Sequence, residues 1–431
     1  MSHPARSAIT LAVLGLSAMA AQAQYQLDVY APPNNLAVLG MSSGGTAGVS
    51  YGSAGNMLLD SATGTFTPIG GNSAANGFSG MPGISGNGLM VAGNATAANG
   101  YSQAATYNVA TGTWTTLGSL GFNATSVVYN GIRQQSAATA ISSDGSTVVG
   151  LAYFNTTGTT GTRQHPVVFR DGLTIDLNPT GTTQTGRALA VSGNGNVVSG
   201  YASNSGIGTL WTWNGASYVA SNPMIANPNT GTMINVQASA LSDNGVWAAG
   251  GSVNGLATNY APIGTFPTIT FSPATLWNTE TNTGILIPYD HVIDTTGGPD
   301  QILNMKTSVA GVSNNGTVIG TFDQCLSCAT SITQQDTWIY SSETGVTMSF
   351  DAYLGSIGQG LTATQHVWGL YGMSADGSAI SGVYFDSATG QSSTFVLRDI
   401  SAVPEPGTWA LFALGLPFAA WRRMRSKAAQ A

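Results

Sequence analysis

Charged residues are scarce in this chain of 431 residues: Asp, Glu, Lys and Arg together make up 7% of it, against about 25% in ordinary globular proteins. Six basic and seventeen acidic residues lie between Gln24 and Ala402, a segment we call the body, which gives it a net charge of −11. Such an acidic surface argues against nucleic acid or an anionic lipid membrane as a partner.

Catalytic signatures are missing as well. No G-x-S-x-G elbow follows a predicted strand, and the chain has no P-loop, no H-E-x-x-H pair and no dinucleotide-binding fingerprint. Three histidines, His165, His291 and His366, lie in the body. We therefore expect no cofactor and favour a protein that is not an enzyme.

The N-terminal segment has the order of a secretory signal peptide. Arg6 precedes an apolar stretch from Ala8 to Ala20, and the small residues Ala21 and Ala23 frame the expected cleavage site. We predict cleavage after Ala23, so that residues 1–23 are the signal and residues 24–402 are exported. A buried helix is the alternative.

The other end, residues 403–431, carries three segments in a fixed order: a short motif, an apolar run from Trp409 to Trp421, and a basic cluster. The motif is Val403, Pro404, Glu405, Pro406 and Gly407, and the cluster is Arg422, Arg423, Arg425 and Lys427. Positive charge directly behind an apolar segment favours the cytoplasmic side of a membrane. We expect transient membrane insertion through 407–421, with the body outside.

In motif, order and position this tail resembles the PEP-CTERM sorting signal of Gram-negative bacteria. The resemblance implies recognition by an exosortase, a membrane protease-transpeptidase that processes the chain near the Pro-Glu-Pro triplet and passes it to the cell surface or extracellular matrix. By analogy with the GPI signal, the processed protein would keep no membrane helix. An uncut tail that remains as an anchor is the alternative.

Two cysteines, Cys325 and Cys328, form a single CxxC pair. Structural zinc sites use four ligands, and a thioredoxin-like redox site needs a βαβ context; the sequence offers neither. Export to an oxidising compartment favours a local disulfide, with free thiols as the alternative.

A motif recurs seven times along the body. A small or apolar pair precedes a Ser, Asp-Gly or Asn-Gly follows, and an apolar and small stretch ends in Gly. The shared serines are Ser42, Ser85, Ser142, Ser192, Ser242, Ser313 and Ser374. Because Asn-Gly and Asp-Gly supply the positive φ of a two-residue hairpin turn, we predict a β-hairpin at each motif. Asp144, Asp243 and Asp376 are then turn residues rather than calcium ligands.

A second strand pair, rich in aromatic residues, follows most motifs, so that each unit holds about four strands. Four antiparallel strands in each of seven units predict an all-β repeat fold, a seven-bladed β-propeller. The seventh unit lacks its last strand, and we expect the isolated strand Tyr25–Tyr30 to complete it and close the ring. A solenoid or two stacked β domains are the alternatives.

From Leu39 to Arg398 the units also resemble the extracellular HAF-type repeat family in their Ser, Asp/Asn-Gly and terminal Gly pattern. The first unit departs from this pattern with Gly44-Gly45, and the sixth is one residue short. The resemblance implies a surface location and no particular reaction.

Two groups of residues are candidate sites. The insertion 288–306 gathers Asp290, His291, Asp294, Asp300 and Lys306, a set that can hold a divalent cation or act as acid and base on a glycan. A solvated loop is the other interpretation of this insertion. The second group is the tryptophans of the strand pairs, Trp114, Trp211, Trp213, Trp247, Trp277, Trp338 and Trp368. We expect them to pack between blades, with a glycan-binding platform as the alternative.

The sequence therefore favours a non-enzymatic exported surface or extracellular-matrix protein with a structural or binding role, for polysaccharide or protein partners. An extracellular glycan hydrolase or lyase that uses the acidic insertion, and a plain secreted binding module, are the alternatives.

Overall fold

The computed structural model describes residues 24–30, 36–52, 55–72, 82–121, 125–129, 132–155, 162–179, 185–202, 206–226, 231–253, 256–257, 269–289, 303–326 and 334–400. The chain divides into a compact unit, Leu27–Arg398, and a second unit made of its two ends, Met1–Gln26 and Asp399–Ala431. The fold described below is that of the compact unit.

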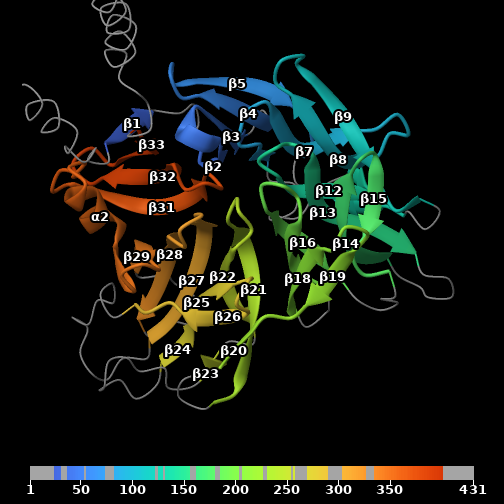
Figure 1. Ribbon diagram of the computed structural model, residues 1–431. Helices are drawn as coiled ribbons and strands as arrows, with labels where there is room; N and C mark the ends of the chain where they lie inside the picture. Colours follow the sequence, from blue (N-terminus) through green and yellow to red (C-terminus); the bar gives the residue numbers. More distant parts are fainter. Residues whose placement is uncertain are drawn as a thin grey trace, which may run out of the picture. The chain divides into compact units, whose positions relative to one another are not determined.

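Seven small sheets are arranged as the blades of a β-propeller (Figure 1), which confirms the predicted fold and blade number. Three blades contain four strands in chain order. The first has β2 (Val38–Met41), β3 (Ala47–Gly52), β4 (Gly55–Asp60) and β5 (Thr65–Gly70). The third has β12 (Ser136–Ile141), β13 (Thr147–Asn155), β14 (Thr162–Arg170) and β15 (Leu173–Asp176). The fourth has β16 (Arg187–Val191), β17 (Val197–Tyr201), β18 (Gly208–Trp213) and β19 (Tyr218–Ser221).

Three further blades carry added strands. The second has β6 (Gly83–Ile84), β7 (Met90–Thr96), β8 (Ser102–Asn108) and β9 (Thr113–Gly118), with the hairpin β10 (Val127–Tyr129) and β11 (Ile132–Gln134). The fifth has β21 (Met233–Leu241), β22 (Trp247–Val253), β25 (Ala274–Asn278) and β26 (Thr283–Leu286), with β20 (Met224–Ala226). The sixth has β27 (Leu303–Val312), β28 (Val318–Leu326), β29 (Gln334–Ser341) and β30 (Val346–Ser349), with β23 (Leu256–Ala257) and β24 (Ile269–Ser272).

The seventh blade joins the two ends of the fold. It contains β31 (Gln365–Met373), β32 (Ala379–Asp386), β33 (Gln391–Asp399) and, as its outermost strand, β1 (Tyr25–Tyr30). The predicted closure by the first strand is therefore confirmed. Asp28 of β1 forms an ion pair with Arg398 of β33, and the Tyr30 hydroxyl donates to the carbonyl of Ser61 at 2.8 Å, which ties the seventh blade to the first.

Each motif forms a hairpin, but the predicted two-residue turn is wrong. Five residues separate the paired strands, for example 142–146 between β12 and β13. A two-residue type I′ turn needs positive φ at both central residues, whereas in the third-blade loop only Gly145 has it, at 76°. The serine changes the geometry: the Gly145 amide donates to the Ser142 carbonyl at 2.9 Å, and the Ser142 amide to the Thr147 carbonyl at 2.8 Å. A two-residue Asp-Gly turn occurs instead at Asp171-Gly172, where both φ values are positive.

The inner strands of each blade are covered on both faces by the neighbouring blades. Runs of small and apolar residues follow from this arrangement, rather than the strict alternation of a half-exposed sheet. In β8, the residues Ser102–Thr106 are all buried. The innermost strands β2, β6, β12, β16, β21, β27 and β31 face the centre, where they line a channel.

Candidate functional site at the central channel

Many of the residues singled out from the sequence lie outside the described part of the chain. These are Ala21, Ala23, the tail motif Val403–Gly407, Arg422, Arg423, Arg425, the insertion residues Asp290, His291, Asp294 and Asp300, and Cys328. Lys306 belongs to β27 and Cys325 to β28. Among the described residues, no three His, Cys, Asp or Glu side chains gather as a metal site.

The seven motif serines are buried and bind their own loops. Ser142 Oγ donates to the Asp144 carboxylate at 2.5 Å and accepts the Thr147 amide at 3.0 Å. Equivalent pairs of bonds form at Ser85, Ser192, Ser242, Ser313 and Ser374. These serines therefore have no hydroxyl to spare for a ligand.

Hydrogen bonds in these loops also set the charge of two carboxylates. Burial alone would raise the pKa of Asp376, but the hydroxyls of Ser374 and Ser378 and the Ser378 amide bring it below the usual value. The pKa of Asp144 is lowered in the same way, by Ser142 and Ser146 against the effect of burial. Both turn residues are therefore held in the ionised form.

Asp243 lies in the turn of the fifth-blade loop, as predicted, but it does not occupy the position that Asp144 and Asp376 hold in their loops. Asn244 takes that place in the fifth-blade loop, because its Oδ1 accepts the Ser242 hydroxyl at 2.7 Å and the Val246 amide at 3.0 Å. Asp243 faces the loop of the fourth blade, where a Cβ added to Gly193 would lie 1.8 Å from the Asp243 Oδ1. Glycine at position 193 therefore makes room for this side chain.

The motif loops are hydrogen-bonded to one another, and we call them together the motif-loop floor. Backbone bonds run from Ser43 to Gly86 (2.8 Å), Gly86 to Ser143 (2.9 Å), Asp144 to Gly193 (3.1 Å), Gly193 to Asp243 (2.8 Å) and Asp243 to Ala375 (2.9 Å). The last bond joins the fifth blade to the seventh and skips the sixth, so the loops meet across the centre. The Gly44 amide, which donates to Ser378 Oγ at 2.6 Å, completes the circuit. The floor therefore narrows one end of the channel.

Three residues before the motif serine, the innermost strands of six blades carry a β-bulge. Register shifts occur there in the first, third, fourth, fifth, sixth and seventh blades, and bulges re-aim side chains. We call the residues at this position the bulge ring: Leu39, Pro82, Thr139, Leu189, Ser239, Ala310 and Tyr371. All seven line the channel.

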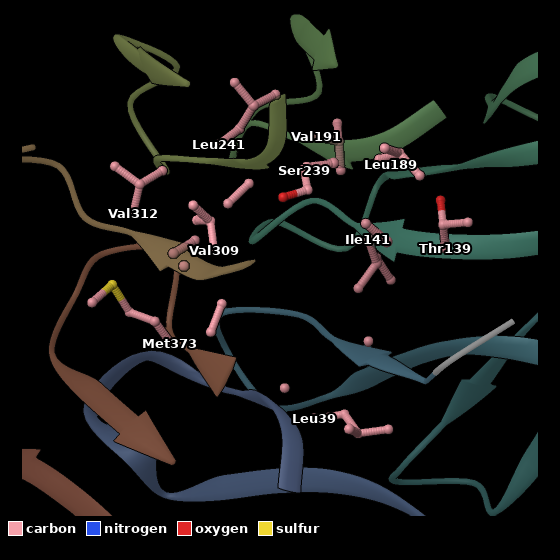
Figure 2. A pocket seen from close by; sticks show the side chains of 18 of the residues that line it. Leu39, Thr139, Ile141, Leu189, Val191, Ser239, Leu241, Val309, Val312 and Met373 are labelled. Atoms are coloured by element: carbon pink, nitrogen blue, oxygen red, sulfur yellow. The ribbon is translucent and has the colours of Figure 1, made fainter. Parts of the chain in front are cut away.

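The channel has a volume of about 550 Å³, within the range of small-molecule sites. Next to the floor its wall is aliphatic and buried, with Ile141, Leu241 and Val312 among the residues that directly precede the serines (Figure 2). The bulge ring follows, and it is more exposed: Ser239 and Tyr371 are both open to solvent. Further along the strands, Arg187 and Gln237 add polar groups to the lining.

Tryptophan burial confirms packing as the role of Trp211, Trp277 and Trp338, which are at most 6% exposed. Trp114 is half-buried, and its Nε1 donates to the Ile69 carbonyl of the first blade at 2.7 Å. Trp368 is the exception at 45% exposed.

Around Trp368 lies a group that we call the blade-seven aromatic cluster: Trp368 itself, the exposed His366, the half-buried Phe385 and, three positions further along β31, the exposed Tyr371. Trp368 occupies a second bulge in β31 and meets the Phe385 ring edge-on at 5.5 Å. His366 contacts the same ring at 5.7 Å. In the short helix α2 (Phe350–Ser356), burial raises the pKa of Asp351, although the Val367 amide and His366 oppose this shift. The sequence pointed to Trp368 but not to its neighbours, because the strand pairing and bulges that place them near it have no signature in composition.

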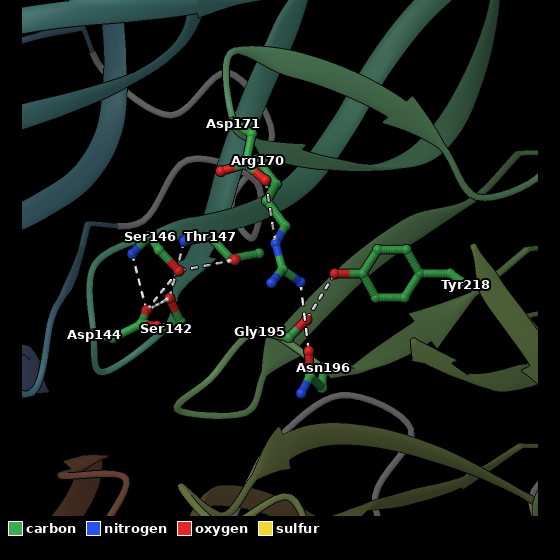
Figure 3. A network of polar contacts seen from close by, with 9 residues as sticks. All are labelled: Ser142, Asp144, Ser146, Thr147, Arg170, Asp171, Gly195, Asn196 and Tyr218. Atoms are coloured by element: carbon green, nitrogen blue, oxygen red, sulfur yellow. Dashed lines mark hydrogen bonds and ion pairs between the residues drawn. The ribbon is translucent and has the colours of Figure 1, made fainter. Parts of the chain in front are cut away.

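Between the third and fourth blades the polar contacts are structural (Figure 3). Arg170 reaches Asn196 Oδ1 at 3.4 Å and stacks over the Trp213 ring at 5.4 Å. The Tyr218 hydroxyl donates to the Gly195 carbonyl at 2.6 Å. These bonds hold the fourth motif loop against its neighbours. The side chains that form them are therefore engaged in structure rather than in binding at the open end of the channel.

Comparison with known proteins identifies the tail. The chain matches the PEP-CTERM protein-sorting motif over residues 402–425, which confirms the predicted sorting signal. None of the curated proteins matches the chain.

Solved structures with similar chain paths have low sequence identity. An oligogalacturonate lyase from Vibrio parahaemolyticus is 10% identical, with a TM-score of 0.48 over 89% of this chain and 98% of that one. The β-propeller domain of the Trilobed protease from Pyrococcus furiosus is 8% identical, with a TM-score of 0.44 over 85% and 95%. TolB from Acinetobacter baumannii is 15% identical, with a TM-score of 0.32 over 58% and 53%. The activities of those proteins say nothing about the chemistry of this one.

The sorting motif defines the class: an exported protein of Gram-negative bacteria, secreted or displayed at the cell surface and processed by an exosortase-type system. The exported body of this chain folds as a seven-bladed β-propeller. Within the described ranges, no helix has the length and hydropathy needed to cross a membrane.

Proposed function

We propose that the protein is a non-enzymatic component of the cell surface or extracellular matrix that binds neutral polysaccharide through the blade-seven aromatic cluster. Trp368 carries this proposal, because it alone of the seven strand-pair tryptophans is among the exposed large side chains. The resemblance of the motifs to HAF-type repeats supports a surface role. The acidic body, with a net charge of −11, favours a neutral polymer over a polyanion.

The geometry of the cluster suits a sugar. An exposed indole face gains from covering by an apolar ring face, and pyranose rings offer such faces together with hydroxyls that stay in water. The edge-on contact with Phe385 and the bulge in β31 fix the orientation of the Trp368 ring before a ligand arrives. Less conformational freedom is then lost on binding.

Affinity electrophoresis tests the binding step. In gels that contain hydroxyethylcellulose or dextran, we expect one of the two polymers to retard the wild-type protein, and Trp368→Ala to abolish most of the retardation. Leu173→Ala, which removes a 63% exposed apolar side chain from β15, is the matched control and should migrate as wild type. Equal retardation of Trp368→Ala and wild type would contradict the role of the cluster.

Intact mass and cell fractionation in the native host test the sorting step. The protein is expected to begin at Gln24, to end near Pro404, and to leave the surface fraction when Val403–Ala431 is deleted. If the protein keeps its tail and stays in the inner membrane, the tail is only an anchor, and the proposed matrix role is wrong.

A glycan hydrolase or lyase is the second candidate function, and Asp351 is the observation that favours it. Its carboxyl lies beside the aromatic cluster, its Oδ1 accepts the Val367 amide at 2.9 Å, and burial raises its pKa, as acid catalysts require. Release of reducing ends from soluble polysaccharide by wild type, but not by Asp351→Asn, would establish this function. No release from the polymer that the protein binds would exclude it for that polymer.

A further inference from the structure

We propose that the central channel is a separate binding site for a small amphipathic carboxylate, whose medium-length aliphatic chain points toward the motif-loop floor and whose head group binds Arg187. The site is independent of the blade-seven cluster in the residues that carry it, apart from Tyr371, which belongs to both. Three observations support the proposal: the aliphatic wall of the channel, the motif-loop floor at its end, and the charge of Arg187.

The wall selects an aliphatic ligand. Beside the floor, each blade contributes an aliphatic side chain, and those of Met41, Ile141 and Leu241 are at most 8% exposed. The Thr139 hydroxyl of the bulge ring is already bonded to the carbonyls of Val149 at 3.1 Å and Ala188 at 2.6 Å. A sugar placed at this depth would therefore find few side-chain partners for its hydroxyls, whereas an alkyl chain would need none.

The floor narrows the aliphatic end of the channel. Hydrogen bonds between the loops of the first to fifth blades and the seventh span the centre, and Gly86, Ser143 and Ala375 of these loops line the channel. A chain that enters from the other end therefore meets aliphatic side chains on its sides and the floor at its tip, and burial of its apolar surface there favours binding.

The charge selects the head group. Among the described residues that line the channel, Arg187 is the one acidic or basic side chain, and none of them carries a carboxylate. Arg170 and Arg398 pair with Asp171 and Asp28, but Arg187 has no ion pair with any described residue. A cation that faces a carboxylate-free pocket is complementary to an anionic ligand.

The Arg187 guanidinium is also held in place. Its Nε donates to Gln164 Oε1 at 3.3 Å, and the Gln164 amide nitrogen donates to the Tyr153 hydroxyl at 3.1 Å. Its two terminal NH₂ groups form no hydrogen bond with any described residue, and together they match the two oxygens of a carboxylate. Arg187 begins β16 and precedes the bulge residue Leu189 by two positions, which places it above the aliphatic wall.

Calorimetry with the processed protein purified from its host tests the head group. Octanoate is expected to bind, and Arg187→Gln should weaken its affinity by about 10- to 100-fold while leaving 1-octanol affinity unchanged. Arg133→Gln is the matched control, since it removes an exposed arginine that lies beside Tyr101, and should bind as wild type. No octanoate binding, or equal loss with both ligands in Arg187→Gln, would overturn the proposal.

Channel-filling variants test the location. Leu189→Trp and Ser239→Trp fill the bulge ring from two different blades, and each should abolish octanoate binding while retaining the wild-type melting temperature and polysaccharide retardation. Leu173→Trp, on an outer strand, controls for the added indole. Octanoate binding that persists in both channel variants would place the site elsewhere. Glucuronate that binds with the same dependence on Arg187 and Leu189 would make the ligand an acidic sugar and overturn the aliphatic assignment.

Discussion

The two ends of the central channel are built on opposite plans. At the floor, all seven blades use a five-residue loop between the first two strands, and most polar side chains of these loops bond within the loop or to the next one. Toward the other end, the residues of the innermost strands differ from blade to blade, with Arg187 in the fourth, Gln237 in the fifth and Trp368 in the seventh. The repeated residues therefore form the framework, and the chemistry available to a ligand comes from residues that do not repeat.

Among substitutions in the repeated loops, Gly377→Ala should lower the unfolding free energy most. Gly377 has a φ of 83°, and an added Cβ would lie 2.3 Å from the Ser313 Cβ of the neighbouring loop. Gly377→Ala is expected to destabilise the fold by about 2–5 kcal/mol, which combines backbone strain with overpacking. Gly345→Ala is the matched control: φ is 69° and no atom lies within 4 Å of the added Cβ, so strain alone should cost about 1–2 kcal/mol. Equal unfolding free energies of the two variants in urea would show that close packing between the loops does not contribute.

A motif serine should matter more than the serine beside it. Ser142→Ala leaves the buried amide of Thr147 without its acceptor and removes a donor to Asp144, for an expected loss of about 1–3 kcal/mol. Ser143→Ala, one position along, changes a side chain with no hydrogen bond of its own among the described residues and should stay within about 0.5 kcal/mol. Urea unfolding of both variants measures the difference, and similar values would mean that the loop does not depend on its serine.

Acid should weaken the floor through Asp144 and Asp376. Because their folded-state pKa values lie below the unfolded value of about 3.9, their stabilising effect is complete above that pH and is lost as the pH falls through the folded-state values. Asparagine fills this position in four other loops, at Asn87, Asn194, Asn244 and Asn315. The double variant Asp144→Asn/Asp376→Asn should therefore fold and lose less stability than wild type between pH 5 and pH 3.

Urea unfolding at a series of pH values gives the comparison. Asp171→Asn removes an exposed carboxylate outside the floor and controls for the change in net charge. Parallel curves for the double variant and wild type would show that these two carboxylates do not couple the fold to pH.

Repetition explains how much of the fold could be predicted. Seven copies of one motif, each followed by an aromatic strand pair, specify the blade number, and the unpaired strand Tyr25–Tyr30 specifies the closure. Turn type could not be read from Asp-Gly or Asn-Gly alone, because the buried serine supplies bonds that a two-residue turn lacks. The same dependence is seen in the fifth-blade loop, where Asn244 rather than its neighbour Asp243 bonds Ser242.

The candidate site was harder to predict, for a related physical reason. A bulge shifts one residue out of the ladder, so which side chain enters the channel depends on register rather than on residue type. The usable signal was the variety of residues three positions before the serine, from Ala310 to Tyr371, beside uniformly small residues one position later. The acidic insertion around Asp290 and His291 lies outside the described residues, and its role stays a prediction.

Loss of Trp368 should have the smallest effect on stability despite the size of the side chain. At 45% exposure, with one edge-on contact to Phe385, its removal is expected to change the unfolding free energy by at most about 1 kcal/mol. That value is smaller than the loss expected from deleting a single buried hydroxyl at Ser142, although an indole is far larger than a hydroxyl. Thermal and urea unfolding of Trp368→Ala and Ser142→Ala under identical conditions test the order. A larger effect at Trp368 would mean that the open end contributes to the framework, and the division between a repeated scaffold and a variable binding end would fail.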